Sequence, residues 1–271
     1  MKADNNTYFE ANKALWDAKT KVHAQSNFYN LEAFLKGGTV LKEIELEELD
    51  QLEGKSLLHL QCHFGLDTLS LARLGAKVTG VDLSTESIKT ARELAQKTGI
   101  EARFIESNVL ELPEVLNEKF DYIFTTYGTI CWLPDLDAWA SIIHRFLKPG
   151  GTFYHADFHP IIDTFSLDYT ELGALSYFTP PQPYMDVPEG TYANTESQIN
   201  LKEYFWNHSL GELMTALLGQ GLLLQSFKEY DYSPYNCFPN LEETEPNRWR
   251  FKNFGDRLPY VYSMKMRKEK E

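Results

Sequence analysis

The sequence predicts an α/β protein built on a doubly wound, mostly parallel sheet, and three observations lead to this prediction. Short apolar runs alternate with amphipathic helical segments through residues 56–158, which is the pattern of repeated βαβ units. Turn residues, such as Gly99 and the run Lys148-Pro149-Gly150-Gly151, close the helical segments. Asp82 directly follows the second apolar run, at the edge where parallel strands place ligand-binding groups.

Seven apolar segments are expected to form the strands of this sheet. The first, Leu57-Leu58-His59-Leu60, is almost continuously apolar, as is typical of a strand buried on both faces. In chain order, the segments are residues 57–60, 77–81, 102–105, 120–124, 152–156, one beginning at 222, and 258–266. Asp67 or Thr68 is expected to cap the helix after the first strand, and Ser84 the helix after the second.

Composition along the chain predicts three parts. Residues 1–54 are rich in aromatic residues and are expected to form an N-terminal helical cap. Residues 55–158 and 202–271 carry the alternating pattern and are expected to form the core. Residues 159–201 interrupt the alternation with five prolines and many aromatic residues, so we interpret this segment as an insertion or lid.

Charge and cysteine content restrict the partners of the chain. Its 271 residues carry a formal net charge of -13, which disfavours nucleic acid and anionic membrane surfaces. No apolar run is long enough to span a bilayer and no signal region is recognised, so a cytoplasmic protein is expected. Cys62, Cys131 and Cys237 lack the spacing of a disulfide framework or of metal ligands, and no metal site is predicted.

The turn between the first strand and its helix, Gln61-Cys62-His63-Phe64-Gly65, is the candidate binding motif. A strand, a tight turn and a helix N-terminus together form a site for a polar ligand. Asp82 lies about twenty residues downstream, where a carboxylate accepts the ribose hydroxyls of a nucleoside. This much is shared by dinucleotide-binding and other nucleoside-binding proteins.

A wider set of residues resembles one family. Residues 58–151 resemble the class I S-adenosylmethionine-dependent methyltransferases. The matching features are the turn 60–65, Asp82, Asn108 after the third strand, the strand 120–124 and the Leu-Lys-Pro-Gly-Gly turn at 147–151. More narrowly, residues 58–68 resemble an uncharacterised bacterial branch, for which the resemblance implies no substrate. That similarity extends to Trp16, His23, Ser26, Tyr29 and residues 206–211.

The resemblance implies S-adenosyl-L-methionine as cofactor and a Rossmann-like methyltransferase fold. The cofactor-binding residues it implies are Leu60, Gln61, Cys62, Gly65, Asp67, Thr68, Asp82, Leu83, Ser84, Asn108, Val109 and Thr126. Gln61 and His63 replace glycines, so either the turn takes another conformation or their side chains point into the site. Gly65 remains where the backbone is expected to approach the cofactor. Asn108 replaces the commoner acid, and its side-chain oxygen still accepts from an adenine amine.

Candidate acceptor and catalytic groups lie near the ends of the first and fourth strands. Tyr127 follows the fourth strand and is expected to line the methyl path, and Tyr29 and His155 are further catalytic candidates. The substrate-binding candidates are His23, His63, Asp157 and His208. Structural roles are the alternatives: packing for His155, helix capping for His208 and support of the strained turn for His63.

Four functions compete at this point. A methyltransferase acting on a small molecule is the leading hypothesis. A nucleic-acid methyltransferase is disfavoured by charge, and by Thr125-Thr126-Tyr127-Gly128 where base-amine enzymes place an Asn/Asp-Pro-Pro-aromatic clamp. A nicotinamide-dependent oxidoreductase and a non-catalytic S-adenosylmethionine-binding protein stay open. The aromatic insertion also suits a homodimer contact.

Overall fold

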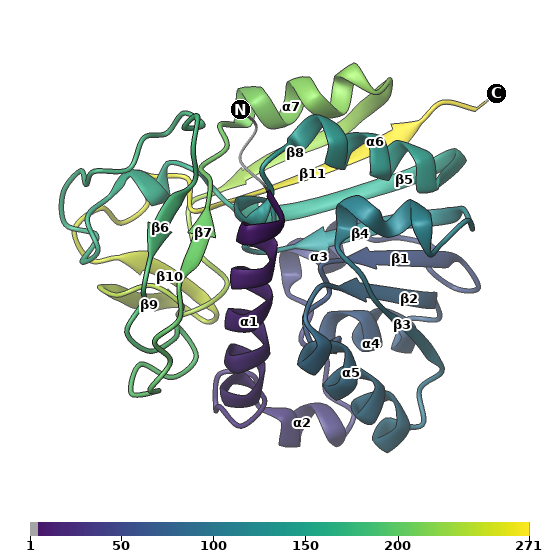
Figure 1. Ribbon diagram of the computed structural model, residues 1–271, viewed down its shortest axis with the longest axis horizontal. Helices are drawn as coiled ribbons and strands as arrows, with labels where there is room; N and C mark the ends of the chain where they lie inside the picture. Colours follow the sequence, from purple (N-terminus) through teal and green to yellow (C-terminus); the bar gives the residue numbers. More distant parts are fainter. Residues whose placement is uncertain (1–4, 271) are drawn as a thin grey trace.

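The structure is a computed structural model that describes residues 5–270. Its centre is a seven-stranded sheet with the order β3-β2-β1-β4-β5-β11-β8 (Figure 1). The strands are β1 (Ser56–Leu60), β2 (Lys77–Asp82), β3 (Ala102–Glu106), β4 (Phe120–Thr126), β5 (Leu147–Phe158), β8 (Leu222–Tyr230) and β11 (Val261–Lys268). The first five pair in parallel, and β11 runs antiparallel between β5 and β8. The predicted seven-stranded, mostly parallel fold is confirmed.

Helices cover both faces of the sheet. The helices are α1 (Asn5–His23), α2 (Leu31–Leu35), α3 (Glu43–Glu48), α4 (Leu66–Arg73), α5 (Thr85–Thr98), α6 (Leu136–Phe146) and α7 (Leu210–Gly219). Three short 3-10 helices, η1 (Val109–Glu114), η2 (Ile130–Trp132) and η3 (Ile162–Thr164), occupy connections. None of the helices within residues 5–270 combines the length and apolar character needed to cross a membrane.

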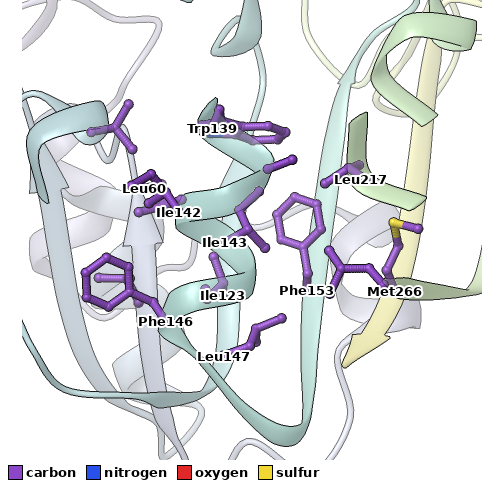
Figure 2. Close-up of a cluster of buried hydrophobic side chains, with 14 of the residues drawn as sticks. Leu60, Ile123, Trp139, Ile142, Ile143, Phe146, Leu147, Phe153, Leu217 and Met266 are labelled. Atoms are coloured by element: carbon purple, nitrogen blue, oxygen red, sulfur yellow. The ribbon is translucent and has the colours of Figure 1, made fainter. Parts of the chain in front are cut away.

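The largest core cluster joins α6 and α7 to one face of the sheet (Figure 2). Trp139 and Phe146 of α6 pack there with Phe153 of β5, Leu217 of α7 and Met266 of β11. Each of these side chains is fully or almost fully buried. Burying such side chains contributes about 1.5–3 kcal/mol each, so this face anchors the antiparallel end of the sheet.

Local capping explains where the helices start and stop. Ser84 accepts the Ser87 N–H at the start of α5, and Gly99 ends this helix in a left-handed conformation, as expected. The expected cap of α4, Asp67 or Thr68, is wrong, because the N-cap is Gly65 and the helix begins at Leu66. Asp67 therefore lies in the first turn of α4, where its negative charge favours the helix N-terminus.

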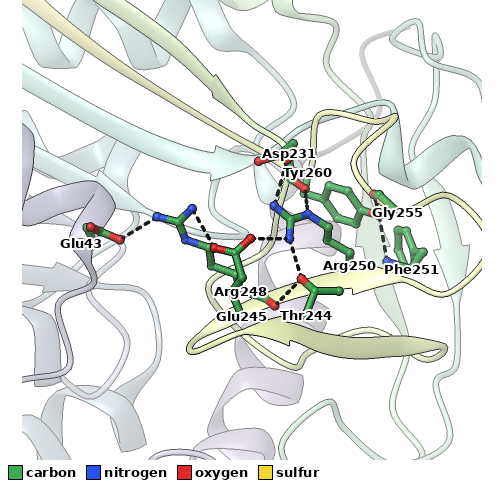
Figure 3. Close-up of polar contacts among 9 residues, drawn as sticks. All are labelled: Glu43, Asp231, Thr244, Glu245, Arg248, Arg250, Phe251, Gly255 and Tyr260. Carbon is green, nitrogen blue, oxygen red and sulfur yellow. Dashed lines mark hydrogen bonds and ion pairs between the residues drawn. The ribbon is translucent and has the colours of Figure 1, made fainter.

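Two hairpins extend beyond one end of the sheet (Figure 1). One pairs β6 (Tyr184–Asp186) with β7 (Glu203–Phe205), and the other pairs β9 (Leu241–Glu245) with β10 (Arg248–Phe251). Arg250 binds Asp231 at 2.9 Å and Glu245 at 3.3 Å, while Arg248 reaches Glu43 of α3 at 3.3 Å (Figure 3). The Arg248–Glu43 ion pair connects the second hairpin to the N-terminal part of the chain.

Candidate active site

A cavity of about 390 Å³ lies at the carboxyl ends of β1, β2 and β4. Residues 61–63, 81–83 and 107–109 form what we call its polar side. What we call its aromatic side consists of Phe28, Tyr29, Tyr127, Phe158, Tyr192, Tyr235 and Phe238. Helix α1 closes the cavity with Phe9, Asn12, Trp16 and Lys19. The volume is that of a typical small-molecule site.

The turn after β1 keeps the backbone conformation that glycines usually supply. Gln61 has φ of 55° and His63 has φ of 50°, so the alternative in which the turn takes another conformation is wrong. Left-handed backbone costs roughly 1–2 kcal/mol at a residue with a side chain. The Gln61 amide offsets part of this by donating to the Thr129 carbonyl at 2.7 Å. Both side chains line the cavity, as the other alternative required.

Asp82 fixes the geometry of the polar side. Its two oxygens accept the backbone N–H groups of His63 and Ser84, both at 2.8 Å. Burial raises the pKa of Asp82 to about 6, while these two hydrogen bonds favour the charged form. Each carboxylate oxygen keeps a second lone pair, so the group can still accept hydroxyl protons from a ligand.

The next strand supplies Asn108, which lines the same side. Its Oδ1 accepts the Leu110 N–H at 3.1 Å and caps η1. Its Nδ2 group and a second Oδ1 lone pair are available to a ligand. Leu83 and Val109 provide apolar walls beside it. This combination suits a flat, heteroatom-bearing ring.

Four residues expected to bind the cofactor do not line the cavity: Leu60, Gly65, Thr68 and Ser84. A Cβ at Gly65 would lie 2.7 Å from the Phe104 ring and 3.0 Å from Ala91 Cβ. Gly65 thus has a packing role between α4, α5 and β3, and its expected approach to the cofactor stays a prediction. The other expected residues, Gln61, Cys62, Asp67, Asp82, Leu83, Asn108, Val109 and Thr126, do line the cavity.

The loop after β4 presents Tyr127 to the aromatic side. Tyr127 has φ of 32°, which is strained for a residue with a side chain. Asp157 stabilises this loop, because its carboxylate accepts the N–H groups of Gly128 at 2.5 Å and Thr129 at 3.3 Å. Asp157 itself lies outside the cavity, so it acts on Tyr127 through the backbone.

Three histidines predicted for the site also lie outside the cavity lining. His155 is fully buried, with Nε2 at 2.8 Å from the Tyr262 hydroxyl. His208 Nε2 lies 2.8 Å from the Leu133 carbonyl oxygen, and Nδ1 of the same ring contacts Glu212 of α7. His23 is buried behind the cavity wall. The structural alternative of packing describes His155, whereas His208 connects two segments instead of capping α7.

An aromatic cluster surrounds His63 where α1 meets the turn. Trp16 lies edge-on to His63 with ring centroids 5.2 Å apart, and His23 stacks on Tyr29 at 5.4 Å. Burial lowers the pKa of His23 to about 3 and holds the pKa of His63 well below its usual range. Both rings are neutral at physiological pH, which suits an apolar wall.

Several lining residues were missed by sequence reasoning. Asn12 and Lys19 belong to α1, and Tyr235 belongs to the loop between β8 and β9. The aromatic content of the N-terminal segment was the available signal for α1. The loop carries no motif that indicates a site. Within residues 5–270, no group of three or more His, Cys, Asp or Glu residues is placed to hold a metal ion.

Comparison with known proteins agrees with this geometry. Residues 57–151 match the family model described as a methyltransferase domain. Methyltransferase phqN of Penicillium fellutanum is 36% identical over 104 residues, which cover 37% of this chain and 31% of that protein. Ubiquinone biosynthesis O-methyltransferase of Proteus mirabilis is 28% identical over 152 residues, covering 55% of this chain and 62% of that protein. The matched regions thus span less than two thirds of either relative.

Solved structures show the same fold. An S-adenosylmethionine-dependent methyltransferase from Mesorhizobium loti aligns with a TM-score of 0.56 at 20% identity, covering 86% of this chain and 100% of that one. Geranyl diphosphate C-methyltransferase from Streptomyces coelicolor aligns with a TM-score of 0.54 at 18% identity, covering 83% and 77%. At these identities the likeness establishes the arrangement of the sheet and helices.

The fold and the polar side suit a nucleoside ligand. Residues 57–151 match a methyltransferase domain, and the chain shares the fold of S-adenosylmethionine-dependent methyltransferases, whose cofactor is S-adenosylmethionine. The residues present fit this cofactor. Gln61 Oε1 is buried without a hydrogen-bond partner, and it lies beside Asp82 and Asn108 around the same cavity. A polar ligand atom can satisfy such a group.

Proposed function

We propose that this chain transfers a methyl group from S-adenosylmethionine to a small organic molecule bound in the cavity. The proposal rests on one observation: a single cavity has both a polar side that suits a nucleoside and an aromatic side. S-adenosylmethionine supplies an electrophilic methyl group. The protein then has to bind the cofactor and the acceptor, orient them and exclude water. These contributions supply most of the rate enhancement in such a transfer.

The polar side would hold the cofactor. Asp82 would accept the ribose hydroxyls, and Asn108 would contact the adenine amine between Leu83 and Val109. Gln61 Oε1 would accept a hydrogen bond from the ammonium of the methionine portion, which would satisfy its unpaired oxygen. Leu60, Gly65, Thr68 and Ser84 would support these groups from behind.

The aromatic side would hold the acceptor. We assign residues 1–54 and 159–201 the role of cap and lid over the core formed by 55–158 and 202–271. Contacts between α1 and β7, the strand that follows the lid and pairs with β6 inside it, support this role. Asn12 exchanges two hydrogen bonds with the Tyr204 backbone, at 2.8 and 2.9 Å, and Lys19 pairs with Glu203 at 3.1 Å. The relatives named ubiquinone biosynthesis O-methyltransferases favour an oxygen acceptor.

Calorimetry with S-adenosylmethionine, S-adenosylhomocysteine and NAD tests the proposal. We expect both sulfur compounds to bind and NAD to bind at least tenfold more weakly. Tight binding of NAD alone would favour a nicotinamide-dependent oxidoreductase and overturn the proposal. A metabolite screen that follows release of S-adenosylhomocysteine would then identify the acceptor. Cofactor binding without turnover of any metabolite would favour a non-catalytic binding protein.

A further inference from the structure

The aromatic side of the cavity contains a buried pair of groups that can carry a proton. Tyr127 lines the cavity, and its hydroxyl donates to Glu45 Oε1 at 2.5 Å. Glu45 belongs to α3, is 1% exposed and does not itself line the cavity. Tyr127 therefore connects the lining of the cavity to a buried carboxylate that lies outside it.

The surroundings of Glu45 hold it in a fixed position. Its Oε2 accepts the Lys42 N–H at 2.5 Å, and Lys42 Nζ lies 4.5 Å from the centre of the Tyr235 ring. Tyr154 donates to the Ile44 carbonyl at 3.2 Å and packs below α3. The ion pair of Arg248 with Glu43 ties the same helix to β10 (Figure 3). Helix α3 is thus anchored from several sides.

The charges near the pair leave Glu45 as a usable base. Burial raises the pKa of Glu45 to about 7, the Tyr127 hydrogen bond lowers it, and the charge of Asp67 raises it. Burial also raises the pKa of Asp67 to about 6, with Lys42 opposing. A carboxylate that titrates near neutral pH is well matched to general-base work.

We propose that Glu45, acting through the Tyr127 hydroxyl, accepts the proton that a hydroxyl-bearing acceptor loses when it is methylated. The inference rests on the proposed function. The acceptor O–H bond breaks and its proton moves to Tyr127 Oη, while the Tyr127 proton moves to Glu45 Oε1. The acceptor oxygen bonds to the methyl carbon, and the carbon–sulfur bond breaks with its electron pair remaining on sulfur. Glu45 ends protonated and returns its proton to solvent after product release.

The same geometry indicates the class of acceptor. Phe158 and Tyr235 flank Tyr127 with ring centroids at 5.6 and 5.1 Å, and Phe238 lies 4.8 Å from Phe158. Rings in this arrangement suit a planar aromatic molecule. An amine that is already neutral, or a thioether, has no proton to lose before attack. A buried base beside an aromatic wall is therefore suited to a phenol.

The test compares two acceptor probes that differ in acidity, catechol and 4-nitrocatechol, with the full-length chain. Calorimetry first establishes that each variant binds S-adenosylhomocysteine. We expect Glu45→Gln to lower kcat for catechol at least about 100-fold, the effect typical of a general base. For 4-nitrocatechol, which is already largely ionised at neutral pH, the expected loss is below about fivefold, with KM unchanged for both probes. Tyr127→Phe should behave in the same way.

Glu47→Gln is the matched control, because this glutamate lies on the same helix and is exposed. It should remain within twofold of the wild type on both probes. An equal loss with the two probes would overturn the inference, and so would failure to methylate either probe while S-adenosylhomocysteine binds. Failure to bind S-adenosylhomocysteine would instead overturn the proposed function.

Discussion

The two sides of the cavity are built in different ways. The polar side comes from three short stretches between residues 61 and 109, each at the end of a neighbouring parallel strand. The aromatic side draws on the segment before α2, the loop after β4, the end of β5, the insertion and the loop between β8 and β9. The match to the methyltransferase domain includes all of the first side and only Tyr127 of the second. Under the proposed function, a common scaffold would hold the cofactor, and the segments outside the matched domain would shape the acceptor site.

Glu45 provides the largest expected effect on the aromatic side. Its folded pKa of about 7 exceeds the unfolded value of 4.5, so the folded state retains a proton that the unfolded state has lost between these values. Raising the pH through this window therefore destabilises the wild type by up to about 3 kcal/mol, at about 1.4 kcal/mol per pH unit. Glutamine does not titrate. In denaturant unfolding, the unfolding free energy of Glu45→Gln relative to that of the wild type should therefore rise from pH 4.5 to 7.

Glu47→Gln is the matched variant for this measurement, because it makes the same change at an exposed residue of the same helix. If the difference between Glu45→Gln and the wild type did not change with pH, Glu45 would not be the buried base of the aromatic side.

Gly65 offers the next largest effect and concerns the scaffold under the polar side. Gly65 and Gly99 both have positive φ, at 80° and 67°, but only a Cβ at Gly65 would meet another residue. Backbone strain should cost about 1 kcal/mol in Gly99→Ala. Gly65→Ala should cost roughly 2 kcal/mol more, because overpacking against Phe104 adds to the strain. Chemical denaturation measures both, and equal losses would contradict the packing role.

The sequence predicts the polar side better than the aromatic side, because only the polar side is marked by patterns of residues that are close together in the chain. The strands, the end of α5 at Gly99 and the position of Asp82 follow from short-range patterns, and they were predicted. The turn conformation at Gln61 and His63 was left open, since positive φ at such residues depends on tertiary contacts. The polar side was largely predicted because its residues follow consecutive strands.

The aromatic side was mostly not predicted, and β5 shows why. Side chains alternate between the two faces of a strand, so Phe158 reaches the cavity while His155 and Asp157 face the opposite side. The sequence marks all three as lying near the strand end but does not give the face. Glu45 was not predicted as a site residue, because its partner Tyr127 lies 82 residues away in the sequence. Only the folded chain brings these two groups together.

Asp82 tests the polar side directly. We expect Asp82→Ala to weaken S-adenosylhomocysteine binding by more than about 1 kcal/mol, which is more than about fivefold, because ribose hydroxyls lose their acceptor. The change also removes the acceptor of the His63 and Ser84 N–H groups, so Asp82→Asn serves as the milder companion. Calorimetry gives the affinities. Unchanged affinity in both variants would reject Asp82 as the ribose-binding group.

Asn12 gives the smallest effect and probes how the added segments close over the site. Its side chain accepts from the Tyr204 N–H and donates to the Tyr204 carbonyl, which holds β7 against α1. Asn12→Ala removes both hydrogen bonds and should ease local opening by about 1 kcal/mol. Hydrogen exchange at the Tyr204 amide should then accelerate about fivefold, while amides of β1 and β2 keep their protection.

Glu10→Ala, an exposed change on the same helix, should leave the exchange of the Tyr204 amide unaltered. The pattern matters more than the size of the effect. Faster exchange confined to the first hairpin would mean that the lid opens independently of the sheet, so the acceptor could enter while the cofactor stays bound. Faster exchange that spread into β1 and β2 would mean that both sides of the cavity open together, and the division between scaffold and added segments would not extend to their dynamics.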